Sequence, residues 1–388
     1  MLRAWTSEPL TALLERHELG GVAEAPFPND GWSGATLTRL VRPRDGRAFI
    51  LKRTSWATDW IARSTRDHAL REGFVASMPL PLAEPLVAPY HGAGADGTSV
   101  GILMPDLTDE LIGWERAAGE PPLTQESVER VMAALARLHA MPWPVAERDD
   151  AVFVWPSVPL RERLLLLTAS SAARLAAGGV AAGERFLTGW AAFERHAPPA
   201  ARELVQSLDR DPQPLLDVLG RLPATVNHGD MKLSNVAFLG EERVALIDWQ
   251  MIALAPVALE LGWLLVSNSG SLPERPEAVL ERYQRAIRSI AGTPVGPIRP
   301  FDPIVPFPLA AAQAAIGNDP APTFRTMELS VGDWDAQLDL SWIIGLLMRG
   351  WRKGLDADAG AVLASGVAAT DDLADWSARA VEAARRRL

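Results

Sequence analysis

The chain has 388 residues, with 38 basic and 48 acidic side chains and a formal net charge of −10 at pH 7. Hydrophobic residues make up 48% and charged residues 22% of the sequence, which is typical of a folded globular protein and excludes a disordered one. The absence of cysteine excludes disulfides, thiolate metal sites and a cysteine nucleophile, and the acidic balance argues against nucleic acid as a partner while suiting a cationic small molecule.

No targeting or membrane-spanning segment is evident in the sequence. Residues 1–19 include Arg3, Glu8 and Arg16 and lack the apolar run of a signal peptide. The most apolar stretches, residues 251–259 and 340–348, are far shorter than the about 20 residues that a spanning helix needs. We therefore expect a cytoplasmic protein without a membrane partner, either a monomer or a homodimer.

The first hundred residues have the pattern of strands and turns with one helix inserted. Residues 36–41 and 48–51 are β-favouring and flank a turn at 43–46, so together they predict a hairpin. A helix is predicted over residues 58–77, which contain no proline and only Gly73 as a weak helix former.

A glycine-rich stretch lies between two further predicted strands, around residues 86–90 and 99–104. Residues 92–97 match G-x-G-x-x-G, the fingerprint of dinucleotide-binding loops. That motif requires a helix to begin within it, so that the helix N-terminus faces the pyrophosphate. Because the residues that follow favour a strand, we interpret 92–97 as a hairpin turn.

Helical patterns dominate from residue 124 to the C-terminus. Thr124 is a plausible N-cap for a helix in which apolar residues recur at helical spacing from Val128 to Leu138. Further helices are predicted over residues 158–176, 182–196, 198–209, 257–266, 275–291, 336–353 and 371–387. A β-like island at residues 226–248 interrupts them.

This island contains the strongest functional pattern in the chain. It has His-Gly-Asp at residues 228–230, then Asn235, and a strand that ends at Asp248. A tight hairpin through Gly240 is expected to return Asp248 close to Asn235, where their oxygens would suit Mg²⁺. Asp230 would lie beside the metal and accept a proton from a hydroxyl. The alternative is a set of turn-forming polar residues in loops.

The pattern resembles the signature of the aminoglycoside phosphotransferase and choline kinase-like enzymes, relatives of protein kinases. In that signature an H-G-D-x-x-x-x-N loop precedes a strand ending in I-D-W, as residues 247–249 do here. The resemblance implies an α+β, bilobal protein-kinase-like fold. A small β-rich nucleotide-binding lobe would span residues 1–105 and end in the hinge, and a large helical lobe with the catalytic loop and acceptor site would span 106–388.

The same resemblance implies a lysine and an acid in the N-terminal lobe. Lys52, after the strand at residues 49–51, resembles the lysine that contacts the α- and β-phosphates of the nucleotide. Glu72, in the following helix, would be its ion-pair partner, and Asp67 is a less favoured substitute.

Two further segments complete the implied nucleotide site. The turn over the phosphates is represented by Gly31, Ser33 and Gly34, and the interlobe hinge by Met104 and Asp106. Taken singly these matches are weak, since a lone strand lysine or a pair of glycines is common. Their order along the chain is what favours the assignment.

The implied activity is transfer of the γ-phosphate of ATP, or alternatively GTP, to a small-molecule hydroxyl. Asp230 would be the base, and Asn235 and Asp248 would hold Mg²⁺. The candidate acceptors are aminoglycosides, sugars, amino alcohols and choline-like metabolites, with the acidic chain favouring a cation. The alternative function is a kinase-like sensor or scaffold that binds nucleotide without catalysis. Protein kinase activity is disfavoured because residues 249–250 are expected to run almost directly into a helix.

Several residues near the motif do not determine the identity of the acceptor. Gln250 and Glu260 depart from the family pattern and are expected near the substrate side, whereas His228 is interpreted as structural. Acidic and tryptophan residues of the C-terminal lobe would either line an acceptor site or belong to the helical core; they are Asp333, Trp334, Asp335, Asp339 and Trp342.

Overall fold

The computed structural model describes most of the chain in side-chain detail. These residues are 8–28, 32–77, 86–112, 123–140, 157–290 and 333–388, with the backbone alone at 144–146, 291 and 324–326. Of the site residues expected from the sequence, Gly31 lies outside the described residues.

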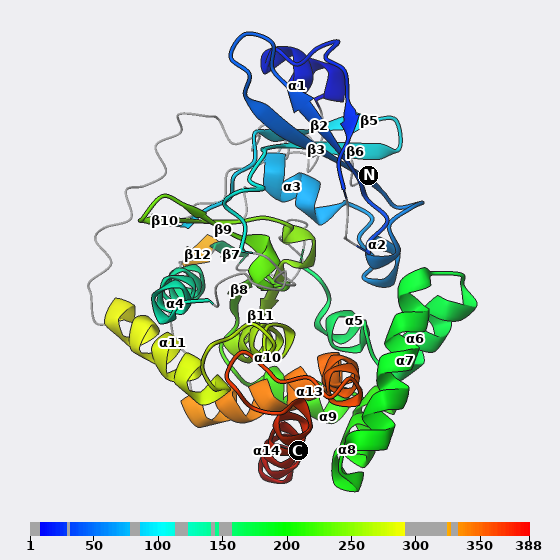
Figure 1. The fold of residues 1–388 in the computed structure, drawn as a ribbon, viewed down its shortest axis with the longest axis vertical. Helices are drawn as coiled ribbons and strands as arrows, with labels where there is room; N and C mark the ends of the chain where they lie inside the picture. Colours follow the sequence, from blue (N-terminus) through cyan, green and yellow to red (C-terminus); the bar gives the residue numbers. More distant parts are fainter. Residues whose placement is uncertain are drawn as a thin grey trace.

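The N-terminal part of the chain forms a five-stranded antiparallel sheet with strand order β1-β2-β3-β6-β5 (Figure 1). The strands are β1 (Ala25–Pro26), β2 (Thr36–Val41), β3 (Ala48–Ser55), β5 (Gly92–Asp96) and β6 (Ser99–Pro105). The predicted hairpin is confirmed, with Leu37 opposite Lys52.

The alternation of side chains along β3 determines on which face of the sheet Lys52 lies. Phe49 and Leu51 pack with Leu13 of helix α1 (Leu10–Arg16) on one face. Ile50 packs on the other face with Leu70, close to helix α3 (Arg71–Ser77). Because side chains alternate along a strand, Lys52 follows Ile50 onto the α3 face.

The single helix predicted over residues 58–77 is wrong in detail, because the chain breaks into helix α2 (Trp60–Ser64) and α3. Asp59 caps α2, its Oδ1 accepting from the Ala62 amide at 2.9 Å. Asp67 accepts from the Arg71 amide at 2.8 Å and so begins the second helix. Two capping carboxylates satisfy the amides that a continuous helix would use internally.

The glycine-rich stretch also differs from the expected hairpin turn. Residues 92–96 are strand β5, and the turn that follows contains Gly97 with φ +60°. A Cβ at Gly94 would lie 2.6 Å from the Leu10 Cα, so this glycine lets α1 pack closely on the strand. The rejection of a dinucleotide loop is confirmed, because a strand and not a helix follows.

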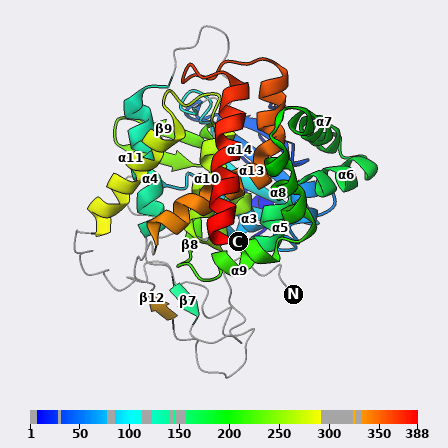
Figure 2. The same ribbon diagram turned by 90° about the horizontal axis from the view of Figure 1, so that it is seen from below.

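The remainder is mostly helical, and the α+β class with a small β-rich lobe and a large helical lobe is confirmed. The helices are α4 (Gln125–Ala140), α5 (Leu160–Leu165), α6 (Ala169–Ala177), α7 (Ala181–His196), α8 (Pro199–Arg210), α9 (Gln213–Leu219), α10 (Val257–Ser267), α11 (Pro276–Ala291), α13 (Trp334–Asp358) and α14 (Ala369–Arg387). Helix α10 is buried on all sides, and α13 packs against α7, α10 and α14 (Figures 1 and 2). None of the described helices is long and apolar enough to cross a membrane.

Two helical predictions need correction. The helix expected over residues 158–176 divides into α5 and α6, because the Ser171 and Thr168 hydroxyls donate to the Leu165 carbonyl at 2.6 and 3.1 Å. Helix α9 is absent from the sequence prediction, since prolines at its start resemble helix breakers. A proline in the first helical turn has no amide partner to lose.

Short strands surround the His-Gly-Asp motif and Asp248. They are β4 (Leu86–Val87), β8 (Thr225–Asn227), β9 (Val236–Leu239), β10 (Arg243–Leu246) and β11 (Ala253–Ala255). The expected hairpin is β9–β10, and β10 also pairs in parallel with β4. A 3₁₀ turn, η3 (Trp249–Met251), and strand β11 follow Asp248, so the chain does not run directly into helix α10 as expected.

Candidate active site

Buried polar groups hold the loop between β8 and η2 (Leu233–Asn235) by its backbone. Both carboxylate oxygens of Glu260 accept from the Gly229 amide at 3.1 Å, and Arg163 Nε donates to the Gly229 carbonyl at 3.1 Å. Gly229 has φ +82°, and a Cβ there would lie 1.8 Å from the Met251 carbonyl oxygen. The loop therefore requires glycine at this position.

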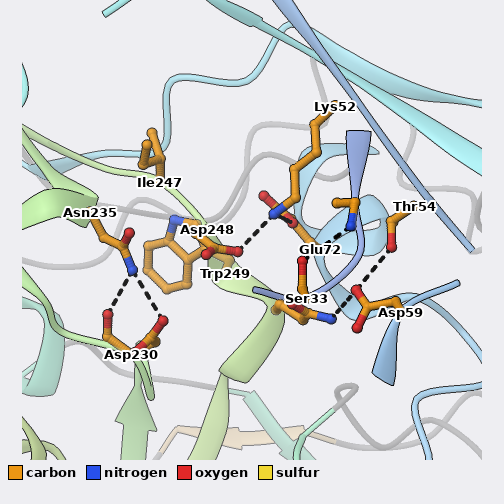
Figure 3. Close-up of polar contacts among 12 residues, drawn as sticks. Ser33, Lys52, Thr54, Asp59, Glu72, Asp230, Asn235, Ile247, Asp248 and Trp249 are labelled. Carbon is orange, nitrogen blue, oxygen red and sulfur yellow. Dashed lines mark hydrogen bonds and ion pairs between the residues drawn. The ribbon is translucent and has the colours of Figure 1, made fainter. Parts of the chain in front are cut away.

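Asp230 and Asn235 lie together at this loop (Figure 3). Asn235 Nδ2 donates to the Asp230 carbonyl oxygen at 2.8 Å and to Asp230 Oδ2 at 3.3 Å. Lys232 Nζ lies 2.9 Å from Asp230 Oδ2. Asp230 Oδ1 is buried and has no hydrogen-bond partner among the described residues, which leaves it able to accept from a further donor.

Asp248 reaches this loop through the β9–β10 hairpin. The Ile247 amide donates to the Asn235 carbonyl at 3.0 Å, which fixes the end of the hairpin against the loop. Asp248 then adopts a left-handed conformation with φ +63°, and its side chain turns toward Lys52 (Figure 3). The sequence prediction that Asn235 and Asp248 approach each other agrees with this arrangement.

Lys52 forms an ion pair with one residue of each lobe. Its Nζ lies 2.5 Å from Glu72 Oε2 and 2.8 Å from Asp248 Oδ1, a residue 196 positions away in the chain. Asp67, the alternative partner, caps α3 instead. Lys52 and Glu72 are almost fully buried, with 8% and 2% of their surface exposed.

Burial and charge act in opposite directions on this cluster. Burial disfavours the ammonium of Lys52, but Asp248 and Glu72 outweigh it and raise the pKa of Lys52 above its ordinary value. Desolvation likewise disfavours the Asp248 carboxylate, while Lys52 and Lys232 lower its pKa below the ordinary value. Both groups are therefore charged at neutral pH.

The glycine turn is anchored to the start of α2. The Ser33 carbonyl accepts from the Trp60 amide at 3.0 Å, and the Ser33 Oγ accepts from the Ala35 amide at 3.3 Å. Gly34 has φ +96°, and a Cβ there would lie 2.4 Å from the Thr58 carbonyl oxygen. The structure therefore places Ser33 and Gly34 beside the N-terminus of α2.

The two expected hinge residues have different surroundings. Met104 is buried on the Lys52 side of the sheet, opposite Ile50. The Asp106 carboxylate accepts from Arg39 Nε at 2.7 Å and from Thr108 Oγ1 at 2.5 Å, and its amide donates to the Ala48 carbonyl. The Asp106 side chain thus stabilises the end of β6, away from the lysine cluster.

Gln250 and Glu260, which the sequence analysis expected near the substrate side, are both buried and bound to other residues of the chain. Gln250 is buried, its Nε2 donates to Asp59 Oδ2 at 2.7 Å, and its carbonyl accepts from Arg71 Nε at 3.1 Å. Glu260 has no exposed surface and binds the catalytic loop. These residues support the loop and the 3₁₀ turn from behind.

The acidic and tryptophan residues of the last two helices contact their own chain. Asp333 caps α13, and Asp339 pairs with Arg386 at 2.6 Å. Trp342 is buried against Trp376, and Trp334 stacks on Tyr283. Trp342 therefore belongs to the helical core.

Sequence analysis missed Lys232 and Tyr90. Lys232 lies within the motif, and its position two residues after Asp230 was the available signal. Tyr90 Oη donates to Glu72 Oε1 at 2.9 Å and accepts from the Asp248 amide at 3.0 Å. No local pattern marks Tyr90, because these contacts exist only in the folded chain.

The residues present fit a magnesium ion by their donor chemistry. Asn235 uses its amide nitrogen toward Asp230, which leaves its side-chain oxygen available as an acceptor. The Asp248 side chain is 33% exposed, so a carboxylate oxygen remains accessible in addition to the one that contacts Lys52. Two hard oxygen ligands with the rest from water and phosphate are typical of Mg²⁺. Among the described residues no group of three or more His, Asp or Glu is arranged to hold a metal.

Comparison with known families gives one clear match. The model of a phosphotransferase enzyme family matches residues 26–295, which include Lys52, Glu72, Asp230, Asn235 and Asp248. No curated protein gives a significant match to the chain.

Solved structures resemble the chain only distantly. A macrolide 2′-phosphotransferase from Brachybacterium faecium is 19% identical with a TM-score of 0.41, over 74% of this chain and 83% of that one. An aminoglycoside phosphotransferase from Alicyclobacillus acidocaldarius is 16% identical with a TM-score of 0.38, over 96% and 95%. A choline kinase from Streptococcus pneumoniae is 9% identical with a TM-score of 0.37, over 94% and 92%.

Proposed function

The chain belongs to the phosphotransferase enzyme family, and we propose that it transfers the γ-phosphoryl group of ATP to a hydroxyl of a small molecule. The observation that carries the proposal is the position of Lys52 Nζ, which contacts Glu72 and Asp248 from opposite lobes. This arrangement brings a buried cation to the metal-binding carboxylate, beside the loop that carries Asp230. We place the junction between the nucleotide-binding and acceptor-binding lobes at residue 105.

Asp230 is the proposed base. Its Oδ1 is the available acceptor, whereas Oδ2 is occupied by Asn235 and Lys232. The acceptor hydroxyl donates its proton to Asp230 as its oxygen forms a bond to the γ-phosphorus, and the bond from that phosphorus to the β–γ bridging oxygen breaks to release ADP. The transition state is loose, so positioning and electrostatics supply most of the catalysis.

Lys52, Asn235 and Asp248 are the proposed ligands of the nucleotide and its metal. Lys52 contacts the α- and β-phosphates and is oriented by Glu72, and Asn235 and Asp248 hold Mg²⁺. When bound, Mg²⁺ neutralises phosphate charge. Ser33 and Gly34, with Gly31, form the turn over the phosphates, and Met104 and Asp106 lie at the segment that meets the adenine. ATP is the proposed donor, with GTP as the alternative.

The proposed acceptor class is a small hydroxylated metabolite or antibiotic, such as an aminoglycoside, sugar, amino alcohol or choline-like compound. The formal net charge of −10 favours a cationic member of this class. The proposed location is the cytoplasm, as expected from the sequence.

Asp230→Asn tests the proposal. The variant keeps the shape of the side chain but loses the base, so we expect kcat to fall by at least about 10²-fold while KM for ATP changes little. The measurement is ADP release with a panel of hydroxylated acceptors. Asp371→Asn, an exposed change at the start of α14, is the matched control and leaves turnover unchanged.

Near-normal turnover by the Asp230→Asn variant contradicts the assignment of the base. If the wild-type protein binds Mg·ATP but phosphorylates no acceptor in the panel, the alternative of a nucleotide-binding sensor or scaffold is favoured instead.

A further inference from the structure

Tyr90 occupies the boundary between the two hydrophobic cores. It lies between β4 and β5 and is one of only two tyrosines in the chain. Its side chain packs against the small cluster of the N-terminal sheet, which includes Ile102, and also against the large cluster of the helical lobe. A hydroxyl at this position is therefore held by both lobes.

The hydroxyl of Tyr90 completes a ring of contacts among four residues. Its Oη lies 2.9 Å from Glu72 Oε1 and 3.0 Å from the Asp248 amide nitrogen. The other Glu72 oxygen, Oε2, contacts Lys52 Nζ at 2.5 Å, and Lys52 Nζ contacts Asp248 Oδ1 at 2.8 Å. Glu72 is thus bound through one oxygen to Lys52 and through the other to Tyr90.

The directions of these hydrogen bonds are determined by chemistry. The Asp248 amide can only donate, so the Tyr90 oxygen accepts from it, and the phenolic proton is then directed to the Glu72 carboxylate. Phenylalanine would fill the same space without either bond.

The Asp248 amide belongs to a strained part of the backbone. Asp248 has φ +63°, a left-handed conformation that costs energy for a residue with a Cβ. A buried amide without a partner would add a further penalty. Tyr90 supplies that partner and so favours the backbone conformation that directs the Asp248 carboxylate to Lys52.

We propose that Tyr90 is a positioning residue that holds the Glu72–Lys52 pair and the Asp248 turn in one arrangement across the two lobes. The inference rests on the proposed function, because it gives Tyr90 its role through the nucleotide and metal ligands. Tyr90 does not contact the reacting atoms. It acts on Mg·ATP through Glu72 and Asp248.

Tyr90→Phe is the direct test. We expect KM for Mg·ATP and the Mg²⁺ concentration for half-maximal rate to rise at least five-fold, while KM for the acceptor stays within two-fold of wild type. Because the hydroxyl acts partly through Glu72, the Tyr90→Phe effect on KM for Mg·ATP should be clearly smaller when Glu72→Ala is already present. An equal factor in both backgrounds would mean that Tyr90 does not act through Glu72 and overturns the proposal.

Tyr283→Phe is the matched control for losing a buried phenolic hydroxyl. Tyr283 is fully buried in α11, and its Oη lies 2.7 Å from Nδ1 of His139 in α4, without contact to Lys52, Glu72 or Asp248 among the described residues. We expect this variant to lower Tm without changing KM for Mg·ATP. An equal rise in KM in both variants would assign the effect to general destabilisation and overturn the proposal.

The Tyr283→Phe protein also allows a measurement that does not depend on turnover. Tyr90 is then the only tyrosine, so a tyrosine ¹³Cζ label gives a single NMR signal. We expect this signal to shift on addition of Mg·ATP, and an unchanged signal at saturating nucleotide overturns the proposal.

The two proposals fail differently. Wild-type protein that binds Mg·ATP and phosphorylates an acceptor, with a Tyr90→Phe variant of equal KM, overturns the role of Tyr90 alone. Wild-type protein that does not bind Mg·ATP in calorimetry overturns the proposed function and the role of Tyr90 together.

Discussion

At the scale of single residues, the buried Glu260 supports the loop that carries Gly229 and Asp230. It is fully buried in α10, and both of its carboxylate oxygens accept from the Gly229 amide at 3.1 Å. Burial raises the pKa of this carboxyl, but His139, His228 and the Gly229 amide outweigh it and hold the pKa of Glu260 below its ordinary value. The folded state therefore favours the ionised carboxylate.

This shift predicts a pH-dependent contribution of Glu260 to stability. Because its pKa is lower in the folded than in the unfolded state, its contribution is complete above about pH 4.3 and is lost as the pH falls through the folded value. We expect Glu260→Gln to lower the free energy of unfolding by about 1–3 kcal/mol at pH 7. The difference from wild type should shrink at pH 3.5, as measured by urea unfolding.

Glu241→Gln provides the comparison for this prediction. Glu241 is exposed on the β9–β10 turn, so its replacement should leave the unfolding free energy nearly unchanged at both pH values. A constant difference between Glu260→Gln and wild type from pH 7 to pH 3.5 would contradict the role of the ionised carboxylate.

At the scale of elements, the loop after β8 and the turn η3 fit together through their backbones. Gly229 faces the Met251 carbonyl so closely that a Cβ would lie 1.8 Å from its oxygen. Asp248 enters η3 in a left-handed conformation, and strand β11 returns to pair with β8. The conformation of the loop that carries Asp230 therefore depends on the conformation of the turn that begins at Asp248.

Gly229→Ala is predicted to disturb both elements. The new methyl group must displace either the loop or η3, in addition to the strain of φ +82° for alanine. We expect a loss of about 2–4 kcal/mol in the free energy of unfolding and a fall of at least about 10²-fold in kcat/KM. Chemical denaturation and the ADP-release assay measure the two effects.

Gly240→Ala separates backbone strain from the steric clash. Gly240 has φ +69° in the β9–β10 turn, and no atom lies within 4 Å of a Cβ placed there. We expect the free energy of unfolding to fall by about 1–2 kcal/mol and turnover to remain unchanged. Equal effects of the two substitutions would show that contact with Met251 is unimportant.

At the scale of the whole molecule, polar contacts between the lobes surround the proposed nucleotide site. Lys52 binds Asp248, while Asp59 and Arg71 both bind Gln250 of η3. These contacts fix the strand lysine, the two short helices and the turn after Asp248 relative to one another. A nucleotide bound at this position would contact both lobes and stabilise the assembled form.

Mg·ATP is therefore predicted to stabilise the folded protein. At about 100 times Kd the expected gain is about 2.7 kcal/mol, or an increase in Tm of roughly 3 °C for a chain of 388 residues. Thermal denaturation with ATP, with Mg²⁺ and with both measures the effect. Lys52→Ala and Asp248→Asn should each reduce the increase to less than half. An equal increase with ATP alone would contradict the metal assignment.

The local sequence was sufficient to identify the phosphotransferase family to which this chain belongs. The spacing of Asp230, Asn235 and Asp248 predicted a hairpin that returns toward the loop, and the resemblance to the family implied the pairing of Lys52 with Glu72. These inferences succeeded because strand alternation, turn residues and the order of a motif are properties of nearby residues. The helical lobe and the α+β class followed from periodicity in the same way.

Only the tertiary structure determined which residues hold the site residues in place. Tyr90 binds an amide 158 residues away, and Gln250 binds a carboxylate 191 residues away. The burial of Glu260 and the position of Trp342 in the core likewise depend on partners elsewhere in the chain. Sequence spacing indicates which residues are candidates for the proposed reaction. Packing determines which side chains are solvent-accessible and which protein groups are hydrogen-bonded to them. Buried polar groups depend on such partners because burial removes the water that would otherwise bind them.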